Sequence, residues 1–241
     1  ITGGQAGSGL HFHTRIVKEG NSLMIDNGRL SAIARKAIAG YMKCASSLTA
    51  FGNTNPTSYL RLVPHQEAPT SICWGDRNRS VLVRVPLGWT GDRDMLTAIN
   101  PLEKTSSEKR TDKQTVELRS PDGSADIYNI LAGLAVAART GLESEDSLKV
   151  AEETYVDVNI HKEENGEKLK SLRQLPVSCA ESASELRKNR AIYEREGVFS
   201  PLLIDGIIKR LESYNDTGIR EEIGNNPQKM TELVERFYHC G

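Results

Sequence analysis

The chain has 241 residues, with 31 basic and 32 acidic side chains and a formal net charge of −1 at pH 7. This length can bury one sizeable core, and no block of like charge is long enough to favour nucleic acid or a membrane surface as a partner. No apolar run approaches the ~20 residues of a membrane-spanning helix. The four cysteines are scattered without a C-x-x-C pair, which argues against a zinc ribbon and a disulfide scaffold, so we expect a soluble, cytoplasmic protein.

The first predicted element is a short strand in GSGLHFH, residues 7–13. On a strand, His11 and His13 point to one face while Leu10 and Phe12 point to the other. Two imidazoles on one face can bind a divalent metal and donate to an anion. Taken alone, the pair favours a simpler interpretation, a half-exposed strand with its polar side chains outward. The glycines before it fit neither the Walker nor the dinucleotide spacing.

Apolar residues at helical spacing predict a helix over residues 30–51, followed by a loop rich in Gly, Asn, Thr and Pro. Two short β-branched segments, residues 80–86 and 115–121, end in proline and are typical of strands. The polar segment 100–114 between them indicates a solvated surface insertion.

An alanine- and leucine-rich segment, residues 126–142, is too apolar all round for a surface helix, so we expect a core helix. A charged loop follows, and then three helices with start signals. These signals are a capping box at Ser182, and a capping side chain before proline at Ser200 and at Asn226. The pattern predicts a mixed first half and a helical C-terminal third.

The segment TVELRSP, residues 115–121, places Val116 and Leu118 on one side of a strand and Glu117 and Arg119 on the other. Glu117 can supply an oxygen ligand to a hard metal ion. Arg119 can clamp a carboxylate or a phosphate with two hydrogen bonds. A cross-strand ion pair on a solvated face explains the same pattern equally well.

Four arginines lie in or beside these loop and strand segments: Arg61, Arg79, Arg84 and Arg119. Guanidiniums that converge on one site repel each other unless anions balance them. With Glu117 and His11 available for a divalent cation, the set favours phosphoryl transfer to a carboxylate over a hydrolytic triad.

Four motifs, in order, then resemble the C-terminal catalytic half of glutamine synthetases: GSGLHFH, SYLRLVPHQEAP, RNRSVLVRVP and VELRSPDGSADIY. A weaker fifth motif is EREGVFSPLLID. The resemblance implies a glutamine synthetase/guanido kinase-like catalytic domain of the α+β class, with a curved antiparallel sheet, helices on its outer face and a helical C-terminal part. Residues 1–142 would hold the strands and two core helices, and 143–241 the charged loop and helical extension of the same domain.

The resemblance implies a metal and nucleotide site. His11 and Glu117 match two ligands of one of two catalytic divalent ions, Mg²⁺ or Mn²⁺. His13 matches the histidine near the ATP phosphates. Arg79 and Arg84 match the arginines that hold the transferring phosphate and the nucleotide phosphates.

It also implies a site for substrate glutamate. Gly7 matches the glycine whose backbone contacts glutamate, and Arg61 and Arg119 match the arginines that bind its carboxylate. Glu67 matches the flap glutamate that closes over the intermediate and helps to form the ammonium site.

The reaction that the resemblance implies makes γ-glutamyl phosphate from glutamate and ATP, and ammonia then displaces the phosphate. Intact relatives are homo-oligomeric rings with sites between subunits. The other metal-binding glutamates and the small N-terminal domain would lie upstream of Ile1. We therefore expect an incomplete piece of a nitrogen-metabolism enzyme, inactive by itself.

Several positions depart from the family pattern: Ala6, His65, Gln66 and Thr115, the last in place of an arginine, and an enlarged loop before Glu117. The changes near the flap leave open a ligase that joins glutamate to a larger amine, such as a polyamine. Thr115 and the missing upstream half leave open a non-catalytic relative. Retention of both acids, both histidines and four arginines argues against that last reading.

Overall fold

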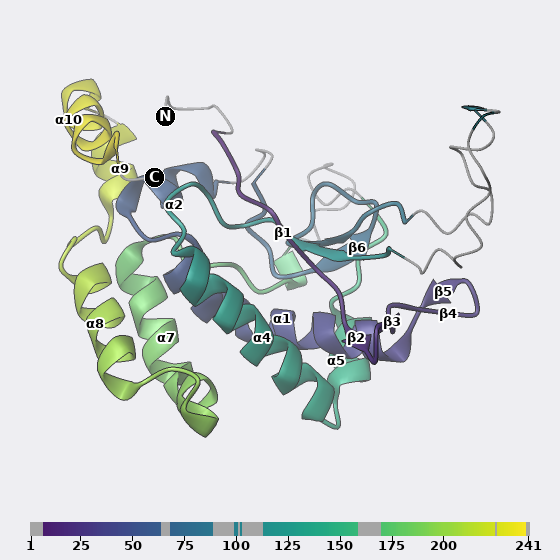
Figure 1. The fold of residues 1–241 in the computed structure, drawn as a ribbon. Coiled ribbons are helices and arrows are strands. Elements are labelled where there is room, and N and C mark those ends of the chain that lie inside the picture. The colour runs from purple at the N-terminus through teal and green to yellow at the C-terminus, as the bar shows by residue number, and fades with distance from the viewer. Residues whose placement is uncertain are drawn as a thin grey trace.

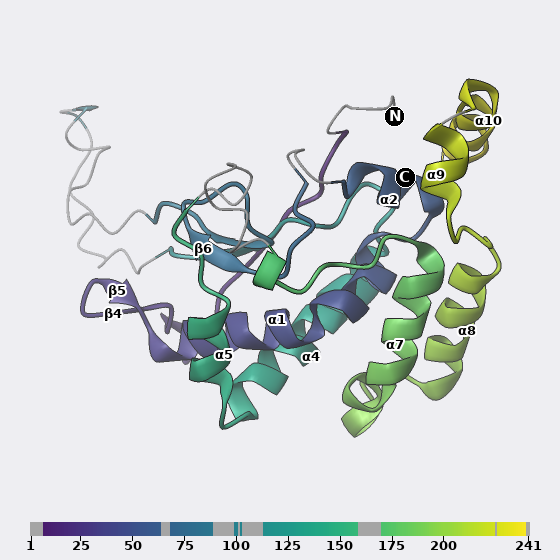
Figure 2. The same cartoon turned by 180° about the vertical axis from the view of Figure 1, so that it is seen from behind.

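The computed structural model describes residues 7–63, 68–88, 99–100, 102, 113–158, 170–224 and 226–239. A four-stranded sheet lies across two long helices, α1 and α4, and the remaining long helices stand beside one end of this pair (Figures 1 and 2). The architecture confirms the α+β class predicted from the sequence.

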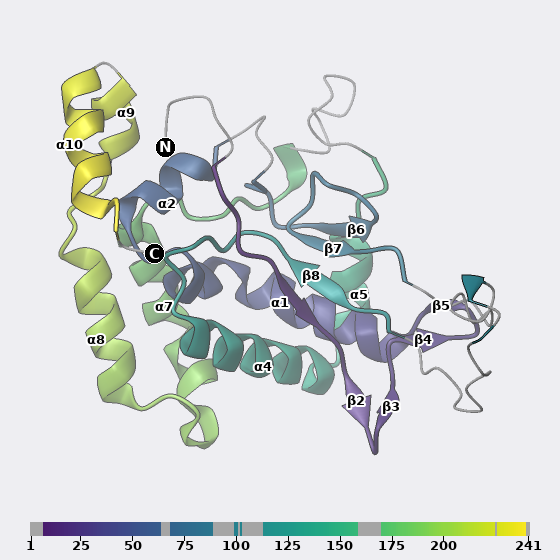
Figure 3. The same cartoon turned by 45° about the horizontal axis from the view of Figure 1, so that its top comes forward.

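The sheet has the order β1 (Phe12–Thr14), β8 (Val116–Leu118), β7 (Val83–Val85) and β6 (Trp74–Asp76). Its β1–β8 and β8–β7 pairs are antiparallel as expected, whereas β7 and β6 run parallel. Figure 3 shows β1 crossing beside β8 above the helices. Both expected strands exist but are shorter than the β-branched segments that predicted them.

Two small hairpins follow β1 and lead into α1. They pair β2 (Val17–Lys18) with β3 (Asn21–Ser22), and β4 (Ile25–Asp26) with β5 (Arg29–Leu30). The sequence analysis did not predict them, because two-residue strands carry too few side chains to show an alternation.

Helix α1 (Ala32–Gly52) confirms the helix predicted from residue 30. It begins where it does because the Ser31 hydroxyl accepts a hydrogen bond from the N–H of Ala34, at 3.0 Å. Its apolar face packs on α4 (Ile127–Glu143). The two backbones meet at glycines: a Cβ atom added to Gly40 would lie 1.9 Å from the carbonyl oxygen of Ala137.

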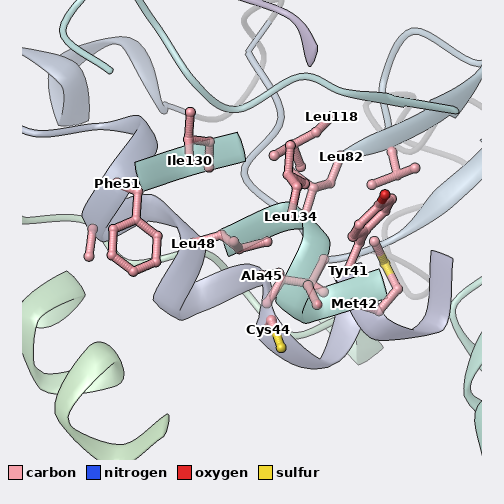
Figure 4. Close-up of a cluster of buried hydrophobic side chains, with 14 of the residues drawn as sticks. Tyr41, Met42, Cys44, Ala45, Leu48, Phe51, Leu82, Leu118, Ile130 and Leu134 are labelled. Atoms are coloured by element: carbon pink, nitrogen blue, oxygen red, sulfur yellow. The ribbon is translucent and has the colours of Figure 1, made fainter. Parts of the chain in front are cut away.

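Helix α4 is not buried all round, contrary to the expectation. Ile127, Tyr128 and Leu131 are 43%, 87% and 48% exposed on one side, while Leu134 on the other side packs in the main core. Figure 4 shows this core between α1, α4 and the sheet. Apolar composition alone did not distinguish a fully buried helix from one with a free apolar side.

The helical part contains α5 (Ser147–Glu153), α7 (Cys179–Glu194), a 3₁₀ turn (Arg195–Gly197), α8 (Pro201–Glu212), α9 (Ile219–Gly224) and α10 (Pro227–Phe237). The predicted caps of α8 and α10 are confirmed: Ser200 accepts from Leu203 N–H and Asn226 from Lys229 N–H, both at 3.2 Å.

The predicted capping box at Ser182 is wrong. Helix α7 begins four residues earlier, because Ser178 accepts the N–H of Glu181 at 3.1 Å. The sequence repeats the Ser-x-x-Glu pattern at 178–181 and 182–185, so the pattern fits both positions. Ser182 is instead buried, with its hydroxyl 2.5 Å from that of Thr49 on α1.

One hydrophobic cluster extends from Met24 to Leu211 and includes residues on both sides of position 142. The division of the chain at that position stays a prediction. Among the described residues, no helix is long and apolar enough to span a membrane.

Candidate active site

A row of polar side chains crosses the three strands β1, β8 and β7. The register places His13 opposite Glu117, and Glu117 opposite Arg84. Because alternate residues of a strand share a face, Val116 and Leu118 point into the core instead. The alternation predicted from TVELRSP is thereby confirmed.

Glu117 is the centre of this row and is 1% exposed. Its Oε1 lies 2.7 Å from His11 Nδ1 and 3.8 Å from Arg119 Nε, and its Oε2 accepts a hydrogen bond from Arg84 Nε at 2.6 Å. Burial raises the pKa of the Glu117 carboxyl, but the hydrogen bond with His11 and the charge and hydrogen bond of Arg84 outweigh burial. The net pKa lies below its ordinary value, so the carboxylate is the favoured form.

His13 is held by a second contact, which joins β1 to the residue directly before β8. Its Nδ1 lies 3.0 Å from Thr115 Oγ1. Both residues are more accessible than Glu117, so His13 sits at the open edge of the row.

Arg61 ends α2 (Pro56–Arg61), a short helix capped by Asn55, and its side chain is buried against the main chain after β8. Nη1 donates to the carbonyl of Ser120 at 2.8 Å. Its aliphatic part lies close to Gly7, since a Cβ atom there would be 3.6 Å from Arg61 Cδ. Gly7 has a φ of +65°, a conformation that glycine adopts without strain.

Gly9 belongs to the site, which the sequence did not predict. A Cβ atom on Gly9 would lie 2.5 Å from Arg61 Nη2 and 2.9 Å from His11 Nε2. The glycine therefore lets a guanidinium and an imidazole approach the same stretch of backbone. Only the glycine-rich composition of the segment hinted at such a need.

The remaining predicted residues are placed less directly. Arg119 is 6% exposed and donates to the carbonyls of Arg79 and, at 3.3 Å, Val81. The structure thus brings the carbonyl of Arg79 to the site, while the residue itself is exposed. Glu67 lies outside the described residues.

The row has the types of donor atom that a divalent metal ion needs, but it has few such atoms. An imidazole nitrogen and a carboxylate oxygen suit Mg²⁺ or Mn²⁺, and the 2.7 Å between His11 Nδ1 and Glu117 Oε1 allows both to face one ion. Within the described residues, no group of three or more His, Cys, Asp or Glu side chains could hold a metal. These residues fit part of a metal site.

The charges around Glu117 favour an anionic ligand. Arg61, Arg84 and Arg119 bring three positive charges to this region, which has two buried carboxyl groups, Glu117 and Asp122. Phosphate or carboxylate groups would balance the excess and can take paired hydrogen bonds from guanidiniums.

A cavity in the described part of the chain lies elsewhere. Its volume is about 910 Å³, between the β4–β5 hairpin, the start of α1 and strand β6, with Trp74 and Tyr155 in its wall. None of the described site residues lines it. Because ionisable groups converge at the polar row, we assign the candidate active site there.

Fold and site together define an α+β catalytic domain whose sheet presents carboxylate, imidazole and guanidinium groups on one face. Residues 1–213 match the family described as "Glutamine synthetase, catalytic domain". The chain belongs to the glutamine synthetase family.

Curated relatives agree with this assignment. The chain is 32% identical over 238 residues to a glutamine synthetase of Thermococcus kodakarensis, and 34% identical over 239 residues to that of Pyrococcus furiosus. Both alignments cover 98% of this chain and 48% of the relative. The chain therefore spans about half the length of the curated relatives that it matches.

Solved structures support the fold. A structure titled "Apo GmaS without ligand" superposes with a TM-score of 0.62 at 22% identity, over 86% of this chain and 41% of the other. A second, titled "GmaS/ADP complex-Conformation 1", gives a TM-score of 0.61 at 21% identity.

Proposed function

We propose that the protein containing this chain is an ATP-dependent ligase that forms glutamine from glutamate and ammonia through γ-glutamyl phosphate. The observation that carries the proposal is Glu117, a buried carboxylate in contact with His11 and Arg84. A buried carboxylate at the centre of a sheet needs such partners. Membership of the family supplies the reaction.

In this proposal, His11 and Glu117 hold a divalent ion, Mg²⁺ or Mn²⁺. The ion, when bound, would neutralise charge on the transferring phosphoryl group. His13, Arg79 and Arg84 bind the phosphates of ATP. The fixed positive charges of the two arginines stabilise the charge that develops during transfer, without reorganisation at that moment.

Glutamate binds beside this row. Gly7 offers its backbone, and Arg61 and Arg119 face the carboxylate of glutamate. Both arginines are buried and anchored on main-chain carbonyls, so their positions cost little further ordering on binding. Glu67 closes over the acyl phosphate, excludes water and helps to bind ammonium.

The 241 residues alone should release no phosphate. The residues that the structure describes supply two donors for one metal ion, and the chain aligns with about half of each curated relative. The intact protein would be a homo-oligomeric ring in the cytoplasm with sites between subunits. Robust phosphate release by this chain with ATP, glutamate and ammonium would contradict the expectation.

A second candidate is a ligase that uses a larger amine. It is favoured by His65 and Gln66, which directly precede Glu67 in the sequence. These residues would change the pocket for the attacking amine, while the chemistry at Glu117 stays the same.

The test measures phosphate release by the full-length protein with ATP, Mg²⁺ and glutamate, against ammonium, ethanolamine and a polyamine. Saturation by ammonium supports glutamine formation. Saturation by ethanolamine or the polyamine, with no response to ammonium, would replace it with the second candidate. No release with any amine would contradict both.

A substitution ties the activity to this site. Glu117→Gln should lower kcat/KM by about 10²- to 10³-fold, the scale for losing one group that stabilises transition-state charge. The matched control is Glu153→Gln, an exposed glutamate on α5 that pairs with Lys149, which should leave activity unchanged. Thermal unfolding of both variants checks that each remains folded, and equal activity in the two would reject the role of Glu117.

A further inference from the structure

His13 of β1 and His11 directly before this strand are matched, at the same spacing, by Glu117 of β8 and Thr115 directly before that strand. His11 contacts Glu117, and His13 contacts Thr115. Because β1 and β8 are antiparallel with His13 opposite Glu117, each contact runs diagonally between residues on one face. The His-x-His and Thr-x-Glu segments thus form two parallel side-chain links between the strands.

Both links use the same ring nitrogen. Nδ1 of His11 lies 2.7 Å from Glu117 Oε1, and Nδ1 of His13 lies 3.0 Å from Thr115 Oγ1. For His13 this fixes the ring through one nitrogen and leaves Nε2 for a ligand, whichever of the two groups donates the proton. Among the described residues, the link to Thr115 is the one side-chain hydrogen bond that His13 makes.

Such a link matters more for His13 than for His11. His13 is exposed, and an exposed ring without a partner samples several rotamers, whose loss on binding opposes the binding of a ligand. Glu117, which lies opposite His13 in the register, contacts His11 and Arg84 instead. Thr115, directly before β8, is the side chain that contacts the His13 ring.

We propose that Thr115 is a positioning residue, whose hydroxyl holds the His13 ring so that Nε2 faces the nucleotide phosphates. The choice of ligand rests on the proposed function. The restraint itself rests on the 3.0 Å contact and the strand register. Thr115 acts through His13 and makes no contact with the nucleotide in this proposal.

The test is a double-substitution cycle in the full-length protein: Thr115→Val, His13→Ala, and both together. Calorimetry with ADP and Mg²⁺ gives the dissociation constant. Thr115→Val, which keeps shape and strand propensity, should weaken ADP binding about tenfold, the scale for one lost hydrogen bond to a group that itself contacts a charge. In the His13→Ala background the same change should have no further effect.

Two further variants separate positioning from general structure. Thr115→Ser keeps the hydroxyl and should bind ADP within about twofold of the unsubstituted protein, because the hydrogen bond is preserved. Thr231→Val, on α10 and away from the sheet, should change nothing. In turnover, Thr115→Val should raise KM for ATP more than it lowers kcat.

The outcomes distinguish the two proposals. Unchanged ADP binding in Thr115→Val, or an equal loss in the His13→Ala background, would overturn the role of Thr115. If the unsubstituted protein binds ADP but releases no phosphate, the proposed reaction fails and the binding cycle still decides on Thr115. No ADP binding by the unsubstituted protein would overturn both.

Discussion

Gly9 has no side chain, and this leaves room for two groups of the candidate site to approach the same stretch of backbone. It is bordered by Arg61 Nη2 on one side and His11 Nε2 on the other. Both groups are tied elsewhere, Arg61 to the Ser120 carbonyl and His11 to Glu117. Neither group can move away without losing a contact. Adding a Cβ atom at position 9 therefore has a cost.

We therefore expect Gly9→Ala to lower kcat/KM of the full-length protein by about 10- to 100-fold, since a displacement of about 1 Å in a reacting geometry has effects of that size. Stability should change little, because the displaced groups belong to the site and not to the core. Steady-state kinetics with varied glutamate gives the first quantity and urea unfolding gives the second.

The matched control is Gly206→Ala on α8, where an added Cβ meets nothing within 4 Å. It should leave activity intact and stabilise the fold by about 0.5–1 kcal/mol, the usual gain for Gly to Ala inside a helix. Full activity in Gly9→Ala would show that Arg61 and His11 rearrange freely.

At this scale the sequence predicted the site well where strand alternation governs. Glu117 and His13 lie on one face because of a two-residue period that sequence reveals directly. The contact of Gly9 with Arg61 could not be predicted, because it joins positions 52 apart through tertiary packing. The same holds for Arg119, which is anchored on carbonyls that no sequence pattern identifies.

Among the elements, α1 and α4 cross and form the layer on which the sheet packs. The two helices approach so closely that a Cβ atom on Gly40 would lie 1.9 Å from the Ala137 oxygen, and one on Gly141 2.0 Å from the Lys36 oxygen. Backbone atoms cannot yield as a flexible side-chain end can. The helices would have to separate.

We expect Gly40→Ala to destabilise the protein by about 3 kcal/mol or more, the upper range for overpacking a core. Gly133→Ala on α4 is the graded control, since its Cβ would meet the ends of the Phe51 and Leu48 side chains at 3.0–3.1 Å. Gly133→Ala should lower the free energy of unfolding clearly less than Gly40→Ala. Urea unfolding measures both variants, and equal losses of stability would show that the two helices can separate easily.

A buried thiol on helix α1 leads us to expect that the stability of the protein falls at alkaline pH. Burial raises the pKa of the Cys44 thiol to about 11, against smaller opposing effects of the hydrogen bond to Tyr193 and the charge of Lys43. In the unfolded chain the pKa of a cysteine thiol is about 8.5. The folded state therefore keeps its proton where the unfolded state loses it, and stability falls as pH rises between these values.

In that window the free energy of unfolding should fall, with Cys44 contributing a slope of up to about 1.4 kcal/mol per pH unit. Burial raises the pKa of the Cys179 thiol and of the Tyr193 hydroxyl in the same direction. Cys44→Ala should show a shallower slope above pH ~8.5 and an unchanged slope near pH 7. Urea unfolding under reducing conditions tests this, and parallel profiles would contradict it.

Elements with a local signal could be predicted. Ser200-Pro201 and Asn226-Pro227 start their helices as expected, because a cap and a fixed proline φ act within one turn. The start of α7 could not be chosen between two Ser-x-x-Glu repeats. Both serines are buried, and their partners differ: the Ser182 hydroxyl pairs with Thr49 on α1, whereas the Ser178 hydroxyl accepts the N–H of Glu181.

For the whole molecule, β-branched segments in the first half and capped helices in the last third predicted a mixed part followed by a helical part, and the family resemblance predicted the α+β class. What sequence patterns did not predict is how these parts share one core, from Met24 to Leu211. Nor did they predict the parallel pairing of β6 and β7. Both depend on contacts between distant segments, which local periodicity does not encode.

The pairing of β1 with β8 has a consequence during synthesis. His13 and Thr115 are 102 positions apart, so the first strand leaves the ribosome long before its partner. At the usual ~5–20 residues per second, the wait is roughly 5–20 s. Helix α1 is made in that interval and can form from local contacts, whereas the two strands must first close a long loop. The polar row therefore cannot assemble until Glu117 has been made, whereas α1 can form before that point.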